Sequence, residues 1–154
     1  MKKVNTKNFK KTLSKFSTGI TVVCVKNNNS IYGKTVNSFN SLSLNPPMVL
    51  FSLGNYSSSI KKFSKTKFLS INILSSKQKK LSDNFASTTP KLENIKFVEG
   101  KNGTAIIPNC IANLECKLID KIKKGDHIIF ICKILELQSN DKLKPLIYFN
   151  SKYF

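Results

Sequence analysis

The sequence predicts a mainly β protein, an antiparallel β-barrel with short helical additions. Runs of β-branched and apolar residues recur along the chain, and short polar turn clusters separate them. Few helical segments lie between these runs, and most connections are hairpin-like, which argues against a repeated βαβ winding. At 154 residues the chain suits one domain, so we expect 1–154 to fold as a single unit.

The chain opens with an amphipathic helix over 6–17, because Phe9, Leu13 and Phe16 recur at helical spacing with lysines on the other side. Two β-branched runs then flank the polar turn 27–30 and predict a hairpin. Later apolar or alternating runs are bounded by turn residues in the same way. The expected strands are, in chain order, 20–25, 31–39, 48–53, 68–74, 110–121, 127–137 and 145–149.

Two further short helices are expected between these strands. One opens at the serines of 57–59, which are favourable residues at a helix start. The other covers 76–86, where a serine and Gln78 have the spacing of a capping box and the apolar face continues to Phe85. The segment 87–109 holds two prolines and two glycines, and it predicts a long irregular loop.

Residues 110–121 alternate, so their apolar side chains share one face and Asn113, Glu115 and Lys117 are expected to face the other way. The four cysteines of the chain all lie in apolar runs, none has C-x-x-C spacing, and there is one histidine. We therefore expect buried, reduced thiols, with neither a metal site nor a disulfide framework.

The charge of the chain is strongly positive. All 26 basic residues are lysine, there are 8 acidic residues, and the formal net charge is +18. Such a charge suits either a polyanion-binding protein or a protein with a lysine bias throughout. Arginine is the preferred residue for bidentate phosphate contacts and guanine edges, so its absence favours the second interpretation. In both cases the positive field would steer anionic cofactors toward the protein.

Targeting and membrane segments are not visible in the sequence. No apolar stretch approaches the ~18–20 residues needed to cross a bilayer. The first six residues are basic and lack the apolar segment of a secretory signal. We therefore expect a cytoplasmic protein without a membrane partner.

The motifs of several common catalytic sites are missing. The chain contains no G-x-G-x-x-G, no G-x-x-x-x-G-K-[ST] and no G-x-S-x-G. Its single histidine, His127, excludes most histidine-dependent constellations. If the protein is an enzyme, a cofactor is expected to carry the reaction.

Four polar features suggest where a cofactor would bind, and each has a simpler interpretation. The run 35–41 suits hydrogen bonding to the polar edge of a heteroaromatic ring, or is an ordinary loop. The serine-rich run 52–59, with lysines one turn on, suits an anion at a helix start, or only caps the helix. Asn72 is a polar residue inside an apolar strand, which suits a contact to a cofactor. The capping box that follows it is the simpler interpretation of this segment and already explains Gln78. His127, next to a turn, is either a surface residue or a contact to a second ligand.

Taken in order, five stretches resemble one family of known proteins. A Thr-Val-Asn-Ser-Phe block before a double proline, with a Gly-Asp-His further on, is a specific combination. The matching stretches are 16–23, 33–47, 68–74, 125–130 and 145–149. Over nearly its whole length the chain is similar to flavin reductases of the FMN-binding split-barrel family. These short-chain reductases supply reduced flavin to two-component monooxygenases.

The resemblance implies a six-stranded antiparallel Greek-key split β-barrel with short flanking helices, working as a homodimer. It implies that NADH or NADPH reduces FMN or FAD by hydride transfer to flavin N5, and that a flavin-dependent monooxygenase is a partner. The flavin-binding residues that it implies are Lys34, Thr35, Val36, Asn37, Ser38, Ser41, Ser52, Ser57, Ser58, Ser59, Asn72, Gln78, Asn84 and Phe85. The nicotinamide-binding residues would be Gly125, Asp126 and His127, with the loop 87–109 bordering that side.

Lys34 departs from the family, which usually has an apolar residue at this position. A cation there would favour the reduced, anionic flavin, or would point to solvent. Two alternative functions stay open: a flavin-binding split barrel without reductase turnover, and a basic β-barrel that binds nucleic acid. The lack of arginine and of an aromatic ladder on one strand speaks against the nucleic-acid alternative.

Overall fold

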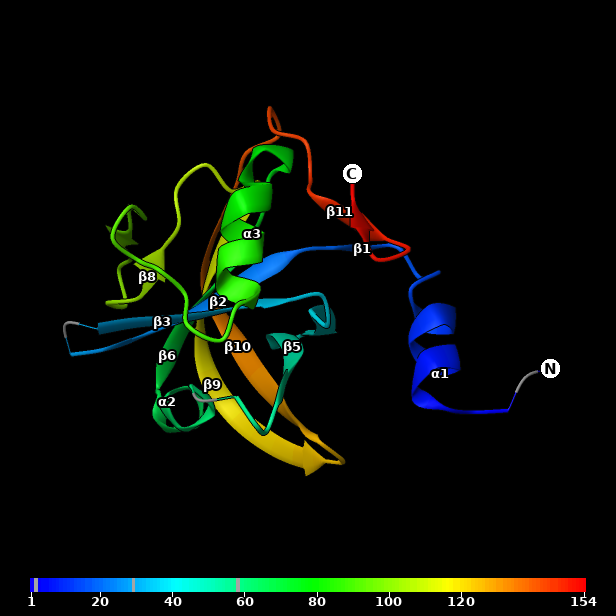
Figure 1. Ribbon diagram of the computed structural model, residues 1–154. Helices are drawn as coiled ribbons and strands as arrows, with labels where there is room; N and C mark the ends of the chain where they lie inside the picture. The colour runs from blue at the N-terminus through cyan, green and yellow to red at the C-terminus, as the bar shows by residue number, and fades with distance from the viewer. Residues whose placement is uncertain (2, 29, 58) are drawn as a thin grey trace.

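The computed structural model describes residues 1, 3–28, 30–57 and 59–154, and it confirms the predicted mainly β class (Figure 1). The strands are β1 (Thr18–Gly19), β2 (Thr21–Asn27), β3 (Ser30–Val36), β4 (Asn40–Leu44), β5 (Pro47–Gly54), β6 (Phe68–Ile73), β7 (Val98–Glu99), β8 (Ala105–Ile106), β9 (Ala112–Lys124), β10 (His127–Ser139), β11 (Ile147–Phe149) and β12 (Lys152–Tyr153). The helices are α1 (Thr6–Leu13), α2 (Ile60–Lys65), the 3-10 turn η1 (Ser76–Gln78) and α3 (Lys79–Ala86).

Seven strands form the main sheet, in the order β3-β2-β6-β9-β10-β5-β4. Every neighbouring pair is antiparallel. Three hairpins, β2–β3, β4–β5 and β9–β10, supply six of these strands, and β6 joins the first hairpin to the third. The order is therefore interleaved, as in Greek-key arrangements, and not sequential.

The main sheet curls until the chain beyond β3 meets β5. The hydroxyl of Ser38, two residues past the end of β3, donates to the carbonyl oxygen of Ser52 in β5 at 3.1 Å. The same hydroxyl accepts from the Ser52 N–H at 3.0 Å. One side chain thus links the two parts of the curled sheet, while β3 and β4 stay its edges.

The curled sheet encloses an inner core drawn from six strands, β2, β3, β5, β6, β9 and β10. The resemblance implies six strands, whereas the main sheet has seven; among the described residues β4, at one edge, adds none to this core. Phe51 and Phe130 stack in the core with ring centroids 5.1 Å apart, and Phe63 of α2 meets Phe130 edge-on at 6.4 Å. All three rings are fully buried. Burial of each stabilises the fold by about 1.5–3 kcal/mol.

A second layer covers the outer face of β2. Val22 and Cys24 pack there against Phe85 of α3 and against residues of the segment 105–110. Both faces of β2 are therefore buried, which explains its continuous apolar run. Gly33 of β3 allows the close approach of α3, because a Cβ at this position would lie 2.4 Å from Cε1 of Phe85.

The main strands and helices lie where the sequence predicts them, but several boundaries differ. The helix expected over 6–17 ends at Leu13, and the strand expected over 31–39 ends at Val36. Residues soon after Val36 form β4, which the sequence analysis did not predict. The expected irregular loop 87–109 contains the hairpin β7–β8. The short strands β1 and β12 were also not predicted.

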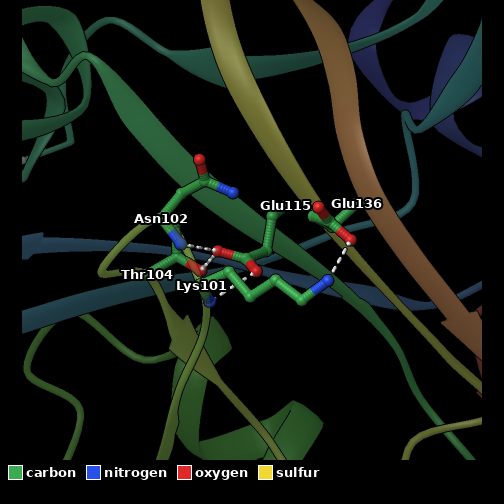
Figure 2. A network of polar contacts seen from close by, with 5 residues as sticks. All are labelled: Lys101, Asn102, Thr104, Glu115 and Glu136. Atoms are coloured by element: carbon green, nitrogen blue, oxygen red, sulfur yellow. Dashed lines mark hydrogen bonds and ion pairs between the residues drawn. The ribbon is translucent and has the colours of Figure 1, made fainter.

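Asn113 and Glu115 alternate with the core residues Leu114 and Cys116, as expected, and both side chains are nevertheless buried. The loop of the β7–β8 hairpin covers Glu115, which is 6% exposed. The carboxylate accepts hydrogen bonds from the backbone N–H of Lys101 at 2.9 Å and of Asn102 at 3.0 Å (Figure 2). It also accepts from the Thr104 hydroxyl at 2.7 Å.

Glu115 therefore clamps the β7–β8 loop to the main sheet. Burial opposes ionisation of its carboxyl, but the donated hydrogen bonds outweigh burial and lower the pKa. Beside this clamp, the Lys101 ammonium pairs with the carboxylate of Glu136 in β10 at 3.0 Å (Figure 2). The strand pattern alone could not reveal the clamp, since its donors belong to a segment that was expected to be irregular.

All four cysteines are buried and carry free thiols. Burial raises the pKa of Cys110 to about 11 and that of Cys132 to about 12. It also raises the pKa of Cys24 and Cys116. Thiols that stay protonated at neutral pH are poor nucleophiles, so the cysteines act as small apolar residues of the core.

The helix α1 stands apart from the main sheet (Figure 1). None of its residues is buried, and Phe9 and Leu13 are each 56% exposed. Its C-terminal end is tied to the turn between β11 and β12, where the N–H of Asn150 donates to the Ser14 carbonyl at 2.7 Å. Among the described residues, no helix has the length and apolar character needed to cross a membrane.

Candidate functional site

A cleft of about 350 Å³ lies between the end of β3, the end of β5 and the start of β10, beside the C-terminal end of α3. Eight residues that the sequence analysis placed at the flavin and nicotinamide sites line it. They are Lys34, Thr35, Val36, Asn37, Ser38, Ser52, Ser57 and His127. Folding thus brings together three segments that are far apart in the sequence.

The end of α3 forms one border of the cleft. The Thr35 hydroxyl donates to the Ser82 carbonyl of α3 at 2.6 Å, which fixes the helix against the end of β3. Ala86 and Thr88 line the cleft here. Neither residue was predicted to lie at a site, because alanine and threonine are common throughout proteins. Only the packing of α3 against β3 places them at the cleft.

Lys34 lies at the cleft and does not simply point to solvent. Its ammonium donates to the carbonyl oxygen of Ser87, just beyond α3, at 2.7 Å. Partial burial lowers the pKa of Lys34. The site therefore includes a partly desolvated cation, whose field acts more strongly on a bound anion than that of a fully solvated lysine.

The serine-rich segment after β5 contributes hydroxyl groups. Ser57 lines the cleft, and its hydroxyl lies 3.1 Å from that of Ser59. Ser59 precedes α2 but makes no side-chain capping bond to the helix. Ser58 lies outside the described residues. The Ser59 hydroxyl therefore bonds to Ser57 and does not cap the helix.

His127 reaches the cleft from the tip of the β9–β10 hairpin. It pairs in register with Gly54 of β5, and the Asn55 N–H donates to the carbonyl of Asp126 at 2.9 Å. The ring Nδ1 of His127 lies 2.7 Å from Oδ1 of Asp126. That hydrogen bond and the histidine charge lower the pKa of Asp126. Gly125 adopts a φ of +56°, which glycine tolerates in this turn.

Asn72 and Gln78 do not line the cleft. Asn72 is fully buried in β6, donates to the Val22 carbonyl at 3.0 Å and accepts from the Ile107 N–H at 3.0 Å. Gln78 accepts from the Ser75 N–H at 2.9 Å, which completes the predicted capping box. Internal hydrogen bonds thus account for both amides.

Four other expected residues also lie away from the cleft walls. Ser41 is exposed on β4, and Asn84 bonds the backbone of Lys91 in the following loop. Phe85 is buried under β3. Ser59 lines a smaller neighbouring pocket. None of these four residues lines the cleft itself.

The cleft has the properties needed to hold a flavin ring. Its volume falls in the range of small-molecule sites. Its walls combine apolar surface from Val36 and Leu53 with the polar groups of Asn37 and Ser52. A flat heteroaromatic ring with carbonyl and N–H groups at its edge needs this combination, and Lys34 adds the positive charge that a phosphate-bearing tail needs.

Comparisons with known proteins identify the family of the chain. The family model for the flavin reductase like domain matches residues 13–154. The chain therefore belongs to the flavin reductase like domain family. Its cleft lies within the matched region.

Two relatives illustrate the sequence similarity. The chain is 34% identical over 137 residues to the FMN reductase (NADH) SmoA of Agrobacterium fabrum, covering 89% of this chain and 79% of that protein. It is 27% identical over 147 residues to an NADH-dependent flavin reductase of a Rhodococcus species, covering 94% of this chain and 82% of that protein.

Solved structures have the same fold. The flavin reductase PheA2 superposes with a TM-score of 0.92 at 34% identity, over 98% of this chain and 97% of that chain. The NADH:FAD oxidoreductase SgcE6 of Streptomyces globisporus, solved with NAD and FAD fragments, gives 0.92 at 25% identity, over 100% of this chain and 96% of that chain. The predicted mainly β, antiparallel fold class is thereby confirmed.

Proposed function

We propose that this protein is an NADH-dependent flavin reductase that reduces FMN or FAD. The observation that carries the proposal is the cleft, which gathers Lys34 to Ser38, Ser52 and His127 from separate parts of the chain. Its place in a chain of the flavin reductase like domain family supports the assignment. Relatives named for NADH favour this donor over NADPH.

In the proposed reaction the protein binds and orients two flat rings. A bound flavin would supply the redox chemistry, with its N5 as the acceptor of the hydride from nicotinamide C4. Asn37 and Ser52 would hydrogen-bond the ring edge, and the Lys34 cation would stabilise negative charge on the reduced ring or on the phosphate. His127 would contact the nicotinamide dinucleotide. Stacking the rings at close range is the main catalytic task, so no acid or base is required to begin.

We also propose a homodimer. On the outer face of β5 and β10, Met48, Leu50, Ile129 and Ile131 alternate with buried core residues and are only half-buried in the single chain. Leu50 and Ile131 are register partners, so they form one continuous apolar strip. A second copy covering this strip would remove it from water.

The proposed biological partner is a flavin-dependent monooxygenase that consumes the reduced flavin. Several relatives are named as reductase subunits or components of such monooxygenases, among them HsaB of Rhodococcus jostii. The positive net charge would help the protein capture anionic flavin and dinucleotide. The cytoplasmic location expected from the sequence stays a prediction.

Anaerobic mixing of the purified protein with FMN or FAD and NADH tests the proposed function. We expect loss of the visible absorbance of the oxidised flavin, together with NADH oxidation. Flavin binding without bleaching by NADH or NADPH would favour the non-reductase alternative. Salt-sensitive binding to single-stranded nucleic acid, without flavin binding, would favour the nucleic-acid alternative.

A further inference from the structure

Two lysine-rich segments, 60–67 and 117–124, lie side by side where α2 meets β9 (Figure 1). Half of the residues in each segment are lysine, against 26 of 154 in the whole chain. The Lys121 ammonium donates to the Ser64 carbonyl at 2.6 Å, and the Leu118 N–H donates to the Lys67 carbonyl at 3.0 Å. Folding therefore joins two runs of positive charge that are distant in the sequence.

The lysines of these segments form a concentration of like charge on the surface. Asp120 is the single acidic residue in the two segments. Lys117 also faces Lys133 directly in the register of β9 and β10, and like charges directly opposite each other destabilise a sheet. A bound anionic partner would relieve this repulsion. All eight lysines are exposed, and we call them the lysine cluster: Lys61, Lys62, Lys65, Lys67, Lys117, Lys121, Lys123 and Lys124.

The lysine cluster is an open surface and not a small-molecule site. None of its lysines lines the cleft or the other main hollows in the described part of the chain. A small ligand needs a concave site that buries most of its surface. Charges spread over an exposed surface suit instead the oppositely charged face of another macromolecule.

The lysine cluster borders the cleft along both of its segments. The N–H of Ile60, the first residue of α2, donates to the carbonyl of Ser57 at 3.0 Å. At the end of the other segment, Lys124 is the register partner of His127 in the β9–β10 hairpin. Ser57 and His127 both line the cleft. A macromolecule bound to the lysine cluster would therefore lie next to the cleft.

Two observations favour a protein over a nucleic acid as this macromolecule. All basic residues of the chain are lysine, whereas arginine is preferred for bidentate phosphate contacts. Phe68 pairs in register with Lys117, and the ammonium of Lys67 lies 5.2 Å from the centroid of its ring. A cation therefore occupies the ring that could have stacked on a base. Carboxylates, which lysine binds as a point charge, suit the cluster better.

Resting on the proposed function, we propose that the lysine cluster is the docking surface for an acidic face of the flavin-consuming monooxygenase. Ion pairs at the rim of an interface speed encounter and fix the orientation of the partners, and salt screens them. A monooxygenase bound there would lie beside the cleft from which reduced flavin leaves. The flavin would then travel a short distance between the two proteins.

Poly-L-glutamate is the probe for an acidic protein face, and two variants of equal net charge locate its binding. Lys121 is kept in both, because it bonds Ser64. The cluster variant combines Lys61→Gln, Lys65→Gln, Lys117→Gln and Lys123→Gln. The control variant changes four exposed lysines outside the lysine cluster and combines Lys7→Gln, Lys10→Gln, Lys142→Gln and Lys144→Gln.

Calorimetry at low ionic strength should show a difference between the two variants. We expect Kd for poly-L-glutamate to rise by about tenfold in the cluster variant and to stay within about threefold of the wild type in the control variant. Carbodiimide joins a carboxylate to an adjacent ammonium as an amide, so it marks the lysines that the bound polymer contacts. In the wild type, peptide mass spectrometry should find these marks mainly in 60–67 and 117–124.

Equal losses of affinity in the two variants, or marks spread evenly over the lysines of the chain, would overturn the proposal. Single-stranded DNA that binds through the lysine cluster when poly-L-glutamate does not would also overturn it, in favour of a nucleic-acid partner. Flavin reduction by NADH is measured on the same preparations. Reduction without cluster-specific binding retains the proposed function and rejects the docking surface. Cluster-specific binding without reduction supports a docking surface for an acidic protein and rejects the proposed function.

Discussion

His127 is the residue whose proposed role is most specific. It lines the cleft, and its Nδ1 is engaged by Asp126 at 2.7 Å, which leaves Nε2 for a ligand. We expect His127→Ala to raise KM for NADH by about fivefold to tenfold, the cost of one lost polar contact, with flavin Kd within about twofold. Unchanged NADH kinetics would contradict the role.

Ser38 is expected to support both the fold and the site. Its hydroxyl makes two hydrogen bonds with the backbone of Ser52, so Ser38→Ala leaves a part-buried N–H and carbonyl unpaired. We expect a loss of about 1–2 kcal/mol in the free energy of unfolding, measured in urea. Ser41→Ala is the control, because Ser41 is exposed on β4, and it should cost less than about 0.5 kcal/mol. Equal losses in the two variants would refute the link.

The site could be predicted from the sequence where a motif is contiguous, and less well elsewhere. The block containing Thr35 to Ser38 lies together at the cleft because it continues one strand. Asn72 was expected there because it is polar within an apolar strand, yet it satisfies buried backbone groups. A single sequence cannot distinguish a polar group that serves a ligand from one that serves the core.

At the scale of elements, the β7–β8 hairpin depends on Glu115. Glu115→Gln replaces one acceptor oxygen by a donor that faces donors already in place. We expect a loss of about 2 kcal/mol in the free energy of unfolding and faster amide exchange in 98–106. Glu136→Gln breaks only the partly exposed ion pair with Lys101 and should cost less than about 1 kcal/mol. Similar costs would show that no clamp exists.

The same carboxylate gives a pH dependence. The pKa of Glu115 is lower in the folded protein than its ordinary value, so its contribution is present at neutral pH. It is lost as the pH falls through the folded pKa, below the ordinary glutamate value of about 4.3. Urea unfolding of the wild type and Glu115→Gln should therefore differ at pH 7 and converge at low pH. A constant difference would contradict this linkage.

Elements were predictable where apolar residues continue over several positions, as in β2 and β10. The strands β7 and β8 have two residues each, too few for a period to appear. Glu115 is buried because the loop of the β7–β8 hairpin packs over it. The alternating pattern of β9 alone would predict an exposed glutamate. The strand β4 was missed because its alternation is made by serines, which are also typical of loops.

At the scale of the whole molecule, the apolar strip on β5 and β10 should hold two copies together. Sedimentation of the wild type should give twice the chain mass of 17.3 kDa. Ile131→Asp places a charge in the strip and should shift the protein toward the monomer. Val98→Asp introduces the same charge at an exposed position of β7 and should not. A monomeric wild type would contradict the dimer.

The proposed function requires a flavin ring in the cleft between the Lys34–Ser38 segment, Ser52 and His127. A crystal structure of the protein grown with FMN tests this most directly. We predict electron density for the ring against Asn37 and Ser52, with the phosphate near Lys34. Density for FMN at another surface, such as the groove beside Asn113 and Gln138, would contradict the account.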